Sequence, residues 1–457
     1  MSYHLVVIGG GTAGLVSAVG AAQLGARVAL IEKHLLGGDC LNYGCVPSKG
    51  LIRAGRAAEA VREASDFGVR VGPATIDFDA AMSRMRRLQG IIGRNDSEER
   101  LRGLGVEVVL GRAKFVSPSA VEVGGRRLEF KRAIIATGGR AMVLPVPGLS
   151  EAGYLTNETV FSLRELPRRL TVIGSGPIGC ELGQTFRRLG SEVTMLSQGS
   201  RVLPKDDPDA AAILEARLRR EGIRLELGTK LVRVERDRTV VFDRGTVASD
   251  AILLAAGRVP GVEDLGLEAA GVKYGKQGVE VDDHLRTSNR RIFAAGDVAS
   301  KFQFTHAADA LARIALQNAL FFGGKRQSAL VVPWATYTDP EIAHVGADSG
   351  PRTFTVKLEE VDRAILDGET EGFARVHADE RGRILGGTMV ARHAGEMIGE
   401  LSLAMTRGLS LADLAGTIHP YPTQAEALKK LGDAYLRTKL TPRARKLLAG
   451  VLRFRPW

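Results

Sequence analysis

The sequence predicts an α/β protein made of two doubly wound domains and a separate α+β domain at the C-terminal end. Two observations indicate the doubly wound domains: a unit of strand, glycine-rich turn, helix and strand opens the chain, and the same unit returns near residue 170. The third observation is a change after residue 331, where alternating strands precede helical segments. A chain of 457 residues has room for these parts, because a domain typically takes about 150 residues.

The opening unit has the pattern of a Rossmann-like dinucleotide-binding domain. A predicted strand at 4–8 leads into a glycine-rich turn, a helix over 15–24 and a second strand over 27–31 that is followed by Glu32. Three glycines match the G-x-G-x-x-G fingerprint: Gly9, Gly11 and Gly14. They permit a tight turn, close approach of a pyrophosphate and close helix packing, and Glu32 is placed to accept hydrogen bonds from a ribose.

The second unit repeats these features. It runs from a predicted strand at 170–173 through a helix over 180–189 to a strand at 192–196. The residues of its turn that we assign to a nucleotide are Gly174, Gly176, Ile178 and Gly179. Two complete units predict two dinucleotides bound by two domains. The alternative is one binding site and one degenerate structural copy.

Further strands mark where the chain leaves and re-enters the first domain. They are predicted at 130–135, 251–256 and 291–295, and a helix follows over 307–321. The turns after these strands carry candidate cofactor-binding residues: Thr137, Gly138, Gly257, Gly296 and Asp297. A strand that ends in a glycine turn suits close approach of the backbone to a ligand.

These patterns set the predicted domain boundaries. The first domain is discontinuous and covers 1–143 and 261–330, the second covers 144–260, and the C-terminal domain covers 331–457. The last domain has predicted strands at 373–377 and 384–390 and a helix over 394–407.

The composition excludes several classes of protein. Hydrophobic residues make up 44% and charged residues 25% of the chain, which are globular averages and exclude disordered, collagen-like and fibrous chains. Three cysteines are too few for a secreted disulfide scaffold. The N-terminus lacks a basic region with a cleavage site, and no apolar run reaches the ~20 residues that span a bilayer. We therefore expect a cytoplasmic protein with no membrane span.

The chain is basic, with a formal net charge of +11. Such a balance is one sign of nucleic-acid binding. Here the basic residues are spread along the sequence without interleaved aromatic residues on which bases would stack. We expect no nucleic-acid partner, and a basic surface also suits an anionic dinucleotide.

Cys40 and Cys45 lie five positions apart and call for a chemical explanation. Pro47 suits the first turn of a helix that continues over 50–60, so Cys45 would lie at a positive helix end, which lowers the pKa of a thiol. A structural disulfide is unexpected in a cytosolic enzyme, and zinc would need more ligands nearby, so no metal site is predicted. We interpret the two as a redox pair; the alternative is two inert buried thiols. The third cysteine, Cys180, is interpreted as a small packed residue.

Together these residues resemble the class I pyridine nucleotide-disulfide oxidoreductases, the group of dihydrolipoamide dehydrogenase, glutathione reductase and mercuric reductase. The resemblance covers essentially the whole chain. The matching motifs are the two fingerprints, the GGxCxNxGCxPSK motif at 37–49, the triplets at 136–138 and 295–297, and Pro-Thr-Gln-Ala-Glu at 422–426.

The resemblance implies that the first domain binds FAD, the second binds NAD(P)H and the last forms the interface of a homodimer. It implies Cys45 as the thiol against the flavin and Cys40 as the thiol that attacks substrate. Asp297 would bind the ribityl chain of FAD, and Lys49 would pair with Glu181 near the flavin and the nicotinamide. Electrons would pass from NAD(P)H through FAD to the disulfide and on to an acceptor.

The C-terminal motif departs from that of the disulfide-reducing members. Those members have His-Pro-Thr-x-x-Glu, whose His acts as acid-base partner in the other subunit. Aligned on Glu426, this chain has Tyr421 at the His position, which is the pattern of mercuric reductase. A phenol with a pKa of about 10 is a poor base but donates a hydrogen bond or approaches a metal ion. His419 is a second candidate for this pocket; the alternative is a structural histidine.

The likeness to mercuric reductase is incomplete as well. That enzyme carries a C-terminal cysteine pair that hands the metal ion to the redox pair, and this sequence has none. We expect a mercuric-reductase-like flavoprotein whose acceptor is a small disulfide, a metal ion or a quinone-like compound.

The choice between NADPH and NADH is predicted from the end of the second strand of the second unit. An acid there would bind the 2'-hydroxyl of the NADH ribose, whereas this chain has Ser197 and Gln198, followed by Arg201 and Lys205. A missing acid with nearby cations favours NADPH. The alternative is that Arg201 and Lys205 are solvated loop charges.

The leading hypothesis is an NAD(P)H-dependent FAD disulfide oxidoreductase of the mercuric-reductase-like branch. Dihydrolipoamide dehydrogenase is the alternative enzyme, and Tyr421 and Ser197 argue against it. A flavin-binding redox sensor that no longer turns over is the alternative from another class, and the intact redox motif argues against it.

Overall fold

The computed structural model describes residues 2–72 and 74–455. The chain forms two compact units. The first comprises Met1–Ser200 and Glu221–Leu330, and the second comprises Arg201–Arg220 and Val331–Trp457. The mixed α/β fold class predicted from the sequence is confirmed.

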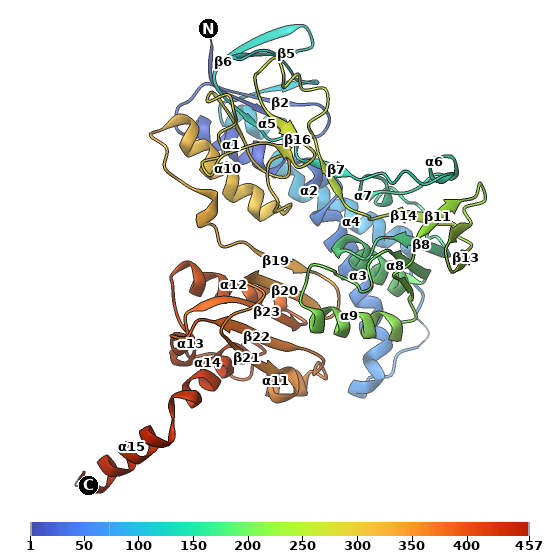
Figure 1. Cartoon of the computed structure of the whole chain (residues 1–457). Coiled ribbons are helices and arrows are strands. Elements are labelled where there is room, and N and C mark those ends of the chain that lie inside the picture. The colour runs from blue at the N-terminus through green and yellow to red at the C-terminus, as the bar shows by residue number, and fades with distance from the viewer. Residues whose placement is uncertain (1, 73, 456–457) are drawn as a thin grey trace. The chain divides into compact units, whose positions relative to one another are not determined.

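A seven-stranded sheet forms the framework of the first unit (Figure 1). Its strands are β1 (Tyr3–Ile8), β2 (Val28–Glu32), β3 (Val106–Leu110), β4 (Lys114–Ser117), β5 (Ala120–Val123), β6 (Arg126–Ile135) and β18 (Ile292–Ala294). They lie in the order β3-β2-β1-β6-β5-β4 with β18 beside β6; β5 is antiparallel to both of its neighbours, β4 and β6, and the other pairs are parallel. A strand buried on both faces needs consecutive apolar residues, and Val-Ala-Leu-Ile of β2 meets this requirement.

Alternate residues of the central strands enter two different cores. One core holds Leu5, Val7 and Leu30 together with residues of α1 (Thr12–Gln23) and α10 (Thr305–Leu320). The other core holds Val6, Ile8 and Ile31 with the antiparallel strands. This division follows from the period of two along a strand, and it places the first turn of α1 at the carboxyl end of β1.

A four-stranded parallel sheet repeats the arrangement. It consists of β8 (Arg169–Ile173), β9 (Glu192–Ser197), β10 (Arg224–Leu227) and β14 (Ala251–Leu254) in the order β10-β9-β8-β14. The helix α8 (Pro177–Leu189) follows β8. Between β10 and β14 the chain forms a separate three-stranded sheet of β11 (Leu231–Val234), β12 (Val240–Phe242) and β13 (Gly245–Val247). The strands β7 (Gly139–Ala141) and β15 (Arg258–Pro260) pair with each other, so the chain leaves the first sheet and returns to it side by side.

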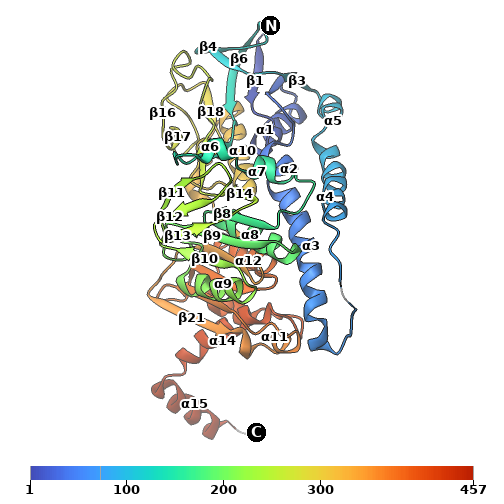
Figure 2. The same ribbon diagram turned by 90° about the vertical axis from the view of Figure 1, so that its right-hand side faces the viewer.

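The predicted redox residues lie on two helices between β2 and β3 in the sequence. They are α2 (Gly38–Asn42) and α3 (Cys45–Glu63), and α4 (Phe78–Gly93) packs against α3 (Figure 2). The unit is completed by α5 (Glu98–Gly103), α6 (Leu149–Ala152), α7 (Asn157–Val160), β16 (Tyr274–Gly275) and β17 (Gly278–Val279).

Three helices begin earlier than the sequence patterns predict. The expected starts at 15, 50 and 180 lie in the structure at Thr12, Cys45 and Pro177. Each helix follows a glycine at the N-cap, namely Gly11, Gly44 and Gly176. The first N–H groups of a helix have no partner inside it, so glycine and proline in the first turn do not interrupt it.

The second unit is built on a five-stranded antiparallel sheet. Its order is β19 (Pro333–Thr336), β20 (Glu341–Gly346), β23 (Ile384–Ala391), β22 (Phe373–Ala378) and β21 (Arg352–Lys357). Its helices are α9 (Pro208–Arg220), α11 (Asp362–Leu366), α12 (Ala394–Thr406), α13 (Leu411–Gly416), α14 (Glu426–Lys439) and α15 (Pro442–Phe454). Within 2–72 and 74–455, no helix is both long and apolar enough to cross a bilayer.

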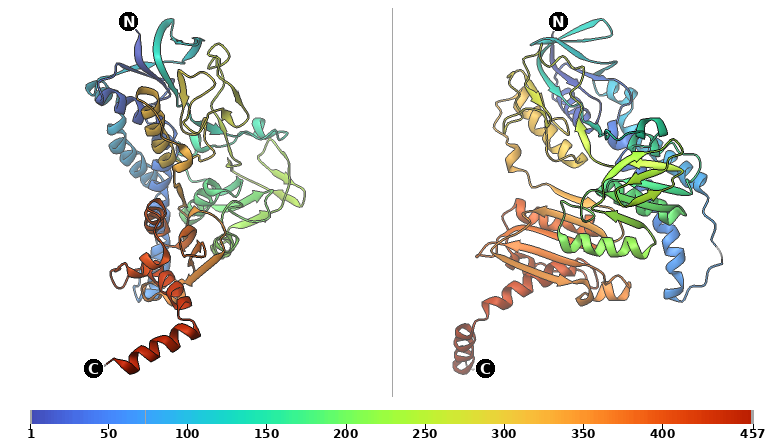
Figure 3. Two further views of the ribbon diagram at one scale, coloured as in Figure 1. Left: turned by 60° about the vertical axis from the view of Figure 1, so that its left-hand side comes forward. Right: turned by 45° about the vertical axis from the view of Figure 1, so that its right-hand side comes forward.

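Residues 201–220 group with the second unit, although the sequence analysis assigns them to the domain over 144–260. Arg375 forms ion pairs of 2.7 Å with both Asp207 and Asp209. Trp334 Nε1 donates a hydrogen bond of 2.8 Å to Asp206 Oδ1. Figure 3 shows α9 beside the strands of this unit. The boundary between the two nucleotide-binding domains stays a prediction.

Replacing Leu30 with Ala tests the first core. Leu30 is fully buried in β2, and truncation leaves a cavity that lowers the free energy of unfolding by about 2–5 kcal/mol. Urea unfolding followed by circular dichroism measures the change. Leu24→Ala is the matched control, because Leu24 is 61% exposed and its truncation changes stability by less than ~0.5 kcal/mol. Equal losses in the two variants would contradict this core.

Candidate active site

The first glycine turn is shaped for close backbone approach. A Cβ atom on Gly14 would lie 1.7 Å from the carbonyl oxygen of Gly9, and one on Gly9 would lie 2.3 Å from the oxygen of Ala136. Gly11 is the N-cap of α1, whose first turn consists of small uncharged residues. The first N–H groups of a helix have no partner inside it, so this N-terminus fits the pyrophosphate of a dinucleotide.

Glu32 is held in place at the end of β2. Its Oε2 accepts a hydrogen bond of 2.6 Å from the N–H of Gly10, and its Oε1 accepts one of 2.7 Å from the N–H of His34. A carboxylate has about four acceptor positions, so two remain for ribose hydroxyls. The residues of this turn therefore fit FAD as the sequence analysis expects.

Two further loops complete this end of the first sheet. Thr137 Oγ1 donates a hydrogen bond of 2.6 Å to the oxygen of Gly261, whose N–H donates to the oxygen of Gly138. Gly296 has a φ of +84°, and a Cβ on it would lie 3.3 Å from Cβ of Ala13 in α1. The structure therefore brings the predicted residues around 137 and 296 to the same end of the sheet as the first glycine turn.

The second fingerprint has equivalent close approaches. A Cβ on Gly174 would lie 2.2 Å from the oxygen of Ala255, and one on Gly179 would lie 2.1 Å from the oxygen of Gly174. A Cβ on Gly176 would meet no atom of the described chain within 4 Å, which leaves this side of the turn open. Ile178, in the first turn of α8, is 36% exposed. Gly257 after β14 has a φ of +133°.

Ser197 is connected to this second turn. Its Oγ accepts hydrogen bonds from Ser175 Oγ at 2.8 Å and from the N–H of Gly199 at 3.2 Å. Gln198 is exposed. Arg201 belongs to the second unit, where its Nη2 donates to the oxygen of Pro204 at 2.8 Å. The end of β9 thus presents hydroxyl and amide groups rather than a carboxylate.

Cys40 and Cys45 are both thiols in this structure, on α2 and at the start of α3. The S–H of Cys40 donates to Cys45 and, together with smaller effects of Thr305 and Lys49, lowers the pKa of Cys45 to about 6 although burial opposes the shift. Thr305 Oγ1 lies 3.4 Å from Cys45 Sγ. The same hydrogen bond, together with burial, raises the pKa of Cys40. The pair therefore holds one proton on Cys40 and a negative charge on Cys45.

Lys49 and Glu181 form the ion pair that the resemblance implies. Lys49 Nζ lies 2.8 Å from Glu181 Oε2, and the Glu181 side chain is 7% exposed. Because Lys49 follows Cys45 by four residues in α3, its ammonium lies on the same helix face as the thiolate. The role of the pair in the reaction stays a prediction.

An arginine that the sequence analysis did not single out lies between two acidic side chains. Arg258 Nη1 is 3.0 Å from Asp39 Oδ2, and its Nε is 3.6 Å from Asp297 Oδ2. Asn157 Nδ2 donates to Asp39 Oδ1 at 2.8 Å. Burial raises the pKa of Asp297, and Arg258 opposes that effect. Arg258 of β15 therefore links Asp39, the residue before Cys40, to the loop that carries Asp297.

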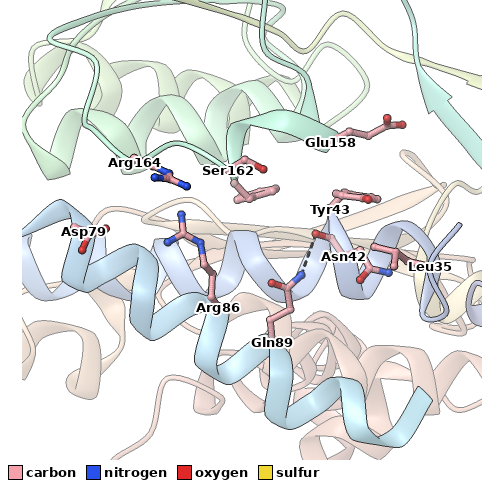
Figure 4. A pocket seen from close by; sticks show the side chains of 10 residues that line it. Leu35, Asn42, Tyr43, Asp79, Arg86, Gln89, Glu158, Ser162 and Arg164 are labelled. Carbon is pink, nitrogen blue, oxygen red and sulfur yellow. Dashed lines mark hydrogen bonds between the residues drawn. The ribbon is translucent and has the colours of Figure 1, made fainter. Parts of the chain in front are cut away.

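A cavity of about 580 Å³ borders the loop between the two cysteines (Figure 4). Asn42 and Tyr43 of this loop line it, and Arg86 of α4 points toward Arg164 across it. Gln89 Nε2 donates hydrogen bonds of 3.0 Å to the oxygens of Leu41 and Asn42. Gln89 therefore fixes the backbone of the redox loop, a role that no local sequence signal indicated.

In the second unit, both ring nitrogens of His419 are engaged. Nε2 lies 3.1 Å from Glu400 Oε2, and Nδ1 lies 3.2 Å from the oxygen of Thr417. Its side chain is 5% exposed. These contacts hold the His419 ring in place, and its part in the reaction stays a prediction.

Tyr421 is 71% exposed, and the carboxylates of Asp362 and Glu426 lie near its phenol. Its hydroxyl donates to Asp362 Oδ2 at 2.9 Å, which raises its pKa, and the charges of Asp362 and Glu426 act in the same direction. The phenol therefore keeps its proton at neutral pH. Glu426 Oε1 lies 3.9 Å from Lys430 Nζ. Within the described ranges, no group of three or more His, Cys, Asp and Glu side chains is arranged to hold a metal ion.

Comparison with known proteins identifies relatives over nearly the whole chain. The profile of the pyridine nucleotide-disulphide oxidoreductases matches residues 3–312, and that of their dimerisation domain matches residues 332–431. A mercuric reductase of Lysinibacillus sphaericus is 37% identical over 445 residues, covering 94% of this chain and 82% of that protein. A dihydrolipoyl dehydrogenase of Thermus scotoductus is 34% identical, covering 95% of this chain and 97% of that protein.

A solved structure has the same fold. It is the Cu(II) complex of the HOCl-induced flavoprotein disulfide reductase RclA from Escherichia coli. Its TM-score is 0.84 at 28% sequence identity, with 93% of this chain and 99% of that chain covered.

The lowered pKa of Cys45 predicts a pH profile for its alkylation. Thiolate is the reactive form, so in the reduced protein the rate with iodoacetamide rises through pH 6 and is level above it. In Cys40→Ala the hydrogen bond to Cys45 is lost, so the midpoint of the rise in alkylation rate moves up toward pH 8.5, about the ordinary pKa of a cysteine thiol. Mass spectrometry of the labelled peptides measures both, with fully buried Cys180 as the unreactive control. A midpoint near 8.5 in the unsubstituted protein would contradict this geometry.

Proposed function

Because the chain belongs to the pyridine nucleotide-disulphide oxidoreductase family, we propose that it uses NADPH to reduce a thiophilic metal ion at the Cys40–Cys45 pair. The enzyme class and the cofactor classes predicted from the sequence are confirmed: the chain is an FAD-dependent NAD(P)H oxidoreductase. When bound, FAD accepts a hydride from the nicotinamide and delivers two electrons to the disulfide. Acceptor, nicotinamide preference, residue roles and assembly are our proposals.

The observation that carries the choice of acceptor is the set of contacts that Tyr421 and His419 make within their own unit. Disulfide exchange by Cys40 needs a base to take its proton and an acid to protonate the leaving thiol. Tyr421 keeps its own proton, and His419 uses both ring nitrogens within its unit. The C-terminal motif of this chain therefore supplies a hydrogen-bond donor rather than a base.

A metal ion meets this site differently. Soft metal ions bind thiolates, and binding displaces the thiol proton directly. Cys45 already carries the negative charge, and Cys40 gives up its proton to the solvent as the metal ion binds. The name of the Lysinibacillus relative and the copper complex of the RclA structure accord with such an acceptor for those proteins.

The proposed preference for NADPH rests on the end of β9. Ser175 donates its hydroxyl proton to Ser197 Oγ, which leaves the O–H of Ser197 to donate to a 2'-phosphate, and this end carries no carboxylate that would repel the phosphate. Gln198 adds an exposed amide. We assign no direct contact to Arg201, whose guanidinium donates to Pro204.

A turnover screen tests acceptor and nicotinamide together. With purified flavin-loaded protein, kcat/KM for Hg(II) or Cu(II) should exceed that for lipoamide and for glutathione disulfide by at least about tenfold, and NADPH should exceed NADH by a similar factor. Consumption of NAD(P)H is the measurement, and Cys40→Ser is the control that removes the metal-binding pair. Faster turnover of lipoamide, or tenfold preference for NADH, would overturn the respective proposal.

We further propose that the working enzyme is a cytoplasmic homodimer. The match of the dimerisation domain to residues 332–431 supports a dimer, and Tyr421 and Glu426 lie within it. A twofold axis would make two equivalent sites, each combining the thiols of one chain with Tyr421 of the other. A disulfide that forms and breaks in each turnover is the catalytic kind that occurs in a reducing cytosol.

Heterodimers distinguish a site shared between chains from a site within one chain. A purified heterodimer of one Cys40→Ser chain and one Tyr421→Phe chain should keep one intact site, hence about half the wild-type metal-reducing rate. The matched control pairs a wild-type chain with a chain that carries both substitutions. If sites are shared, this control has no intact site; an active control with an inactive first heterodimer would refute the shared arrangement.

A further inference from the structure

The C-terminal helix α15 lies outside the region that matches the dimerisation domain and packs little against its own unit. It covers Pro442–Phe454, and Thr441 Oγ1 caps its start by accepting a hydrogen bond from the N–H of Ala444. Pro442 occupies the first helical position, where its ring fits. Every residue of the helix is exposed or half-buried, and the helix extends away from the sheet of its unit in Figures 1 and 3.

One face of α15 is apolar. Ala444, Leu447, Leu448 and Val451 have the i, i+3, i+4, i+7 spacing of a helix face that would normally be buried. Leu447 is 71% exposed and Phe454, at the end of the helix, is 88% exposed. Single exposed apolar residues are ordinary, but a contiguous stripe indicates a binding surface.

The other face of α15 is cationic. Five basic residues lie on or directly after the helix: Arg443, Arg445, Lys446, Arg453 and Arg455. The sequence has no acidic residue after Asp433, so these charges are not balanced along this segment. At 100° per residue, Arg443 and Arg445 flank the apolar stripe, which suits contact with anions at its border.

The length of α15 decides how it meets a bilayer. Thirteen residues make a helix of roughly 20 Å, shorter than the hydrocarbon core of ~30 Å. An amphipathic helix with basic residues around an apolar face lies in the plane of the interface, with its side chains at the boundary of headgroups and acyl chains. Two copies of the helix packed on each other through the stripe would instead bring together the Arg443 and Arg445 side chains that flank it.

We propose that α15 docks this oxidoreductase onto the surface of an anionic phospholipid bilayer. Leu447, Leu448, Val451 and Leu452 enter the acyl boundary, and the arginines and Lys446 contact lipid phosphates. The interaction is independent of the identity of the electron acceptor. It places the enzyme on a membrane surface while the catalytic units stay in water.

Sedimentation with vesicles tests the proposal on the full-length, flavin-loaded protein. The vesicles are phosphatidylcholine alone, or phosphatidylcholine with about a third phosphatidylglycerol. We expect at least about tenfold more protein bound to the anionic vesicles. Raising NaCl from ~0.1 M to ~0.5 M should release protein, because the screening length falls.

Two variants and two controls locate the binding to the faces of α15. Leu447→Glu with Val451→Glu removes the apolar stripe, and Arg445→Glu with Lys446→Glu reverses the charge; each should reduce binding about tenfold or more. The matched controls are Leu24→Glu and Arg290→Glu, which alter exposed residues of the first unit and should bind like the wild type. NADPH oxidation and flavin content verify that all variants are folded.

Three outcomes would overturn the proposal. The wild type fails to bind anionic vesicles, the α15 variants bind as well as the wild type, or the controls lose binding equally. Light scattering tests the competing explanation, in which the helix contacts a second copy of the chain. That explanation holds if the wild type does not bind vesicles and the α15 variants have the mass of a monomer while the wild type has the mass of a dimer.

Discussion

The chemistry of this protein depends on an unequal sharing of one proton between two thiols. The S–H of Cys40 donates to Cys45, so Cys45 becomes a thiolate at neutral pH while Cys40 stays protonated. Lys49 on the same helix and Thr305 at the start of α10 stabilise that charge. The position of Cys45 at the first residue of α3 adds the positive end of the helix dipole. The two cysteines are chemically distinct before any substrate arrives.

Such a distinction requires the backbone of the loop between Cys40 and Cys45 to have a fixed conformation. Side chains from several other elements hold that backbone by hydrogen bonds and an ion pair. Gln89 of α4 binds two carbonyl oxygens of the loop. Asp39, directly before Cys40, is bound by Asn157 and by Arg258. Because β15 carries Arg258 back to the first sheet from the second, the redox loop is tied to both nucleotide-binding halves of its unit.

In the second unit, by contrast with Cys45, the side chain of interest keeps its proton. Asp362 and Glu426 keep the proton on Tyr421, and Glu400 holds His419 in place. The C-terminal motif therefore presents a hydrogen-bond donor supported by carboxylates. In our proposal, this property favours capture of a metal ion over thiol-disulfide exchange. The cationic helix α15 follows the same unit without entering its core.

The sequence by itself determined the features that arise from local spacing. The glycine fingerprints, the redox motif and the apolar runs predicted both nucleotide-binding units and the position of Cys45 at a helix start, because tight turns, helix ends and buried strands depend on neighbouring residues. The tertiary structure alone decided which distant groups meet. Thr305 is 260 positions from Cys45, and Arg258 reaches Asp39 only because two strands pair between the sheets. Likewise, the partner of Tyr421 comes from α11, since packing within the unit, not spacing in the sequence, sets which side chains lie within hydrogen-bonding distance.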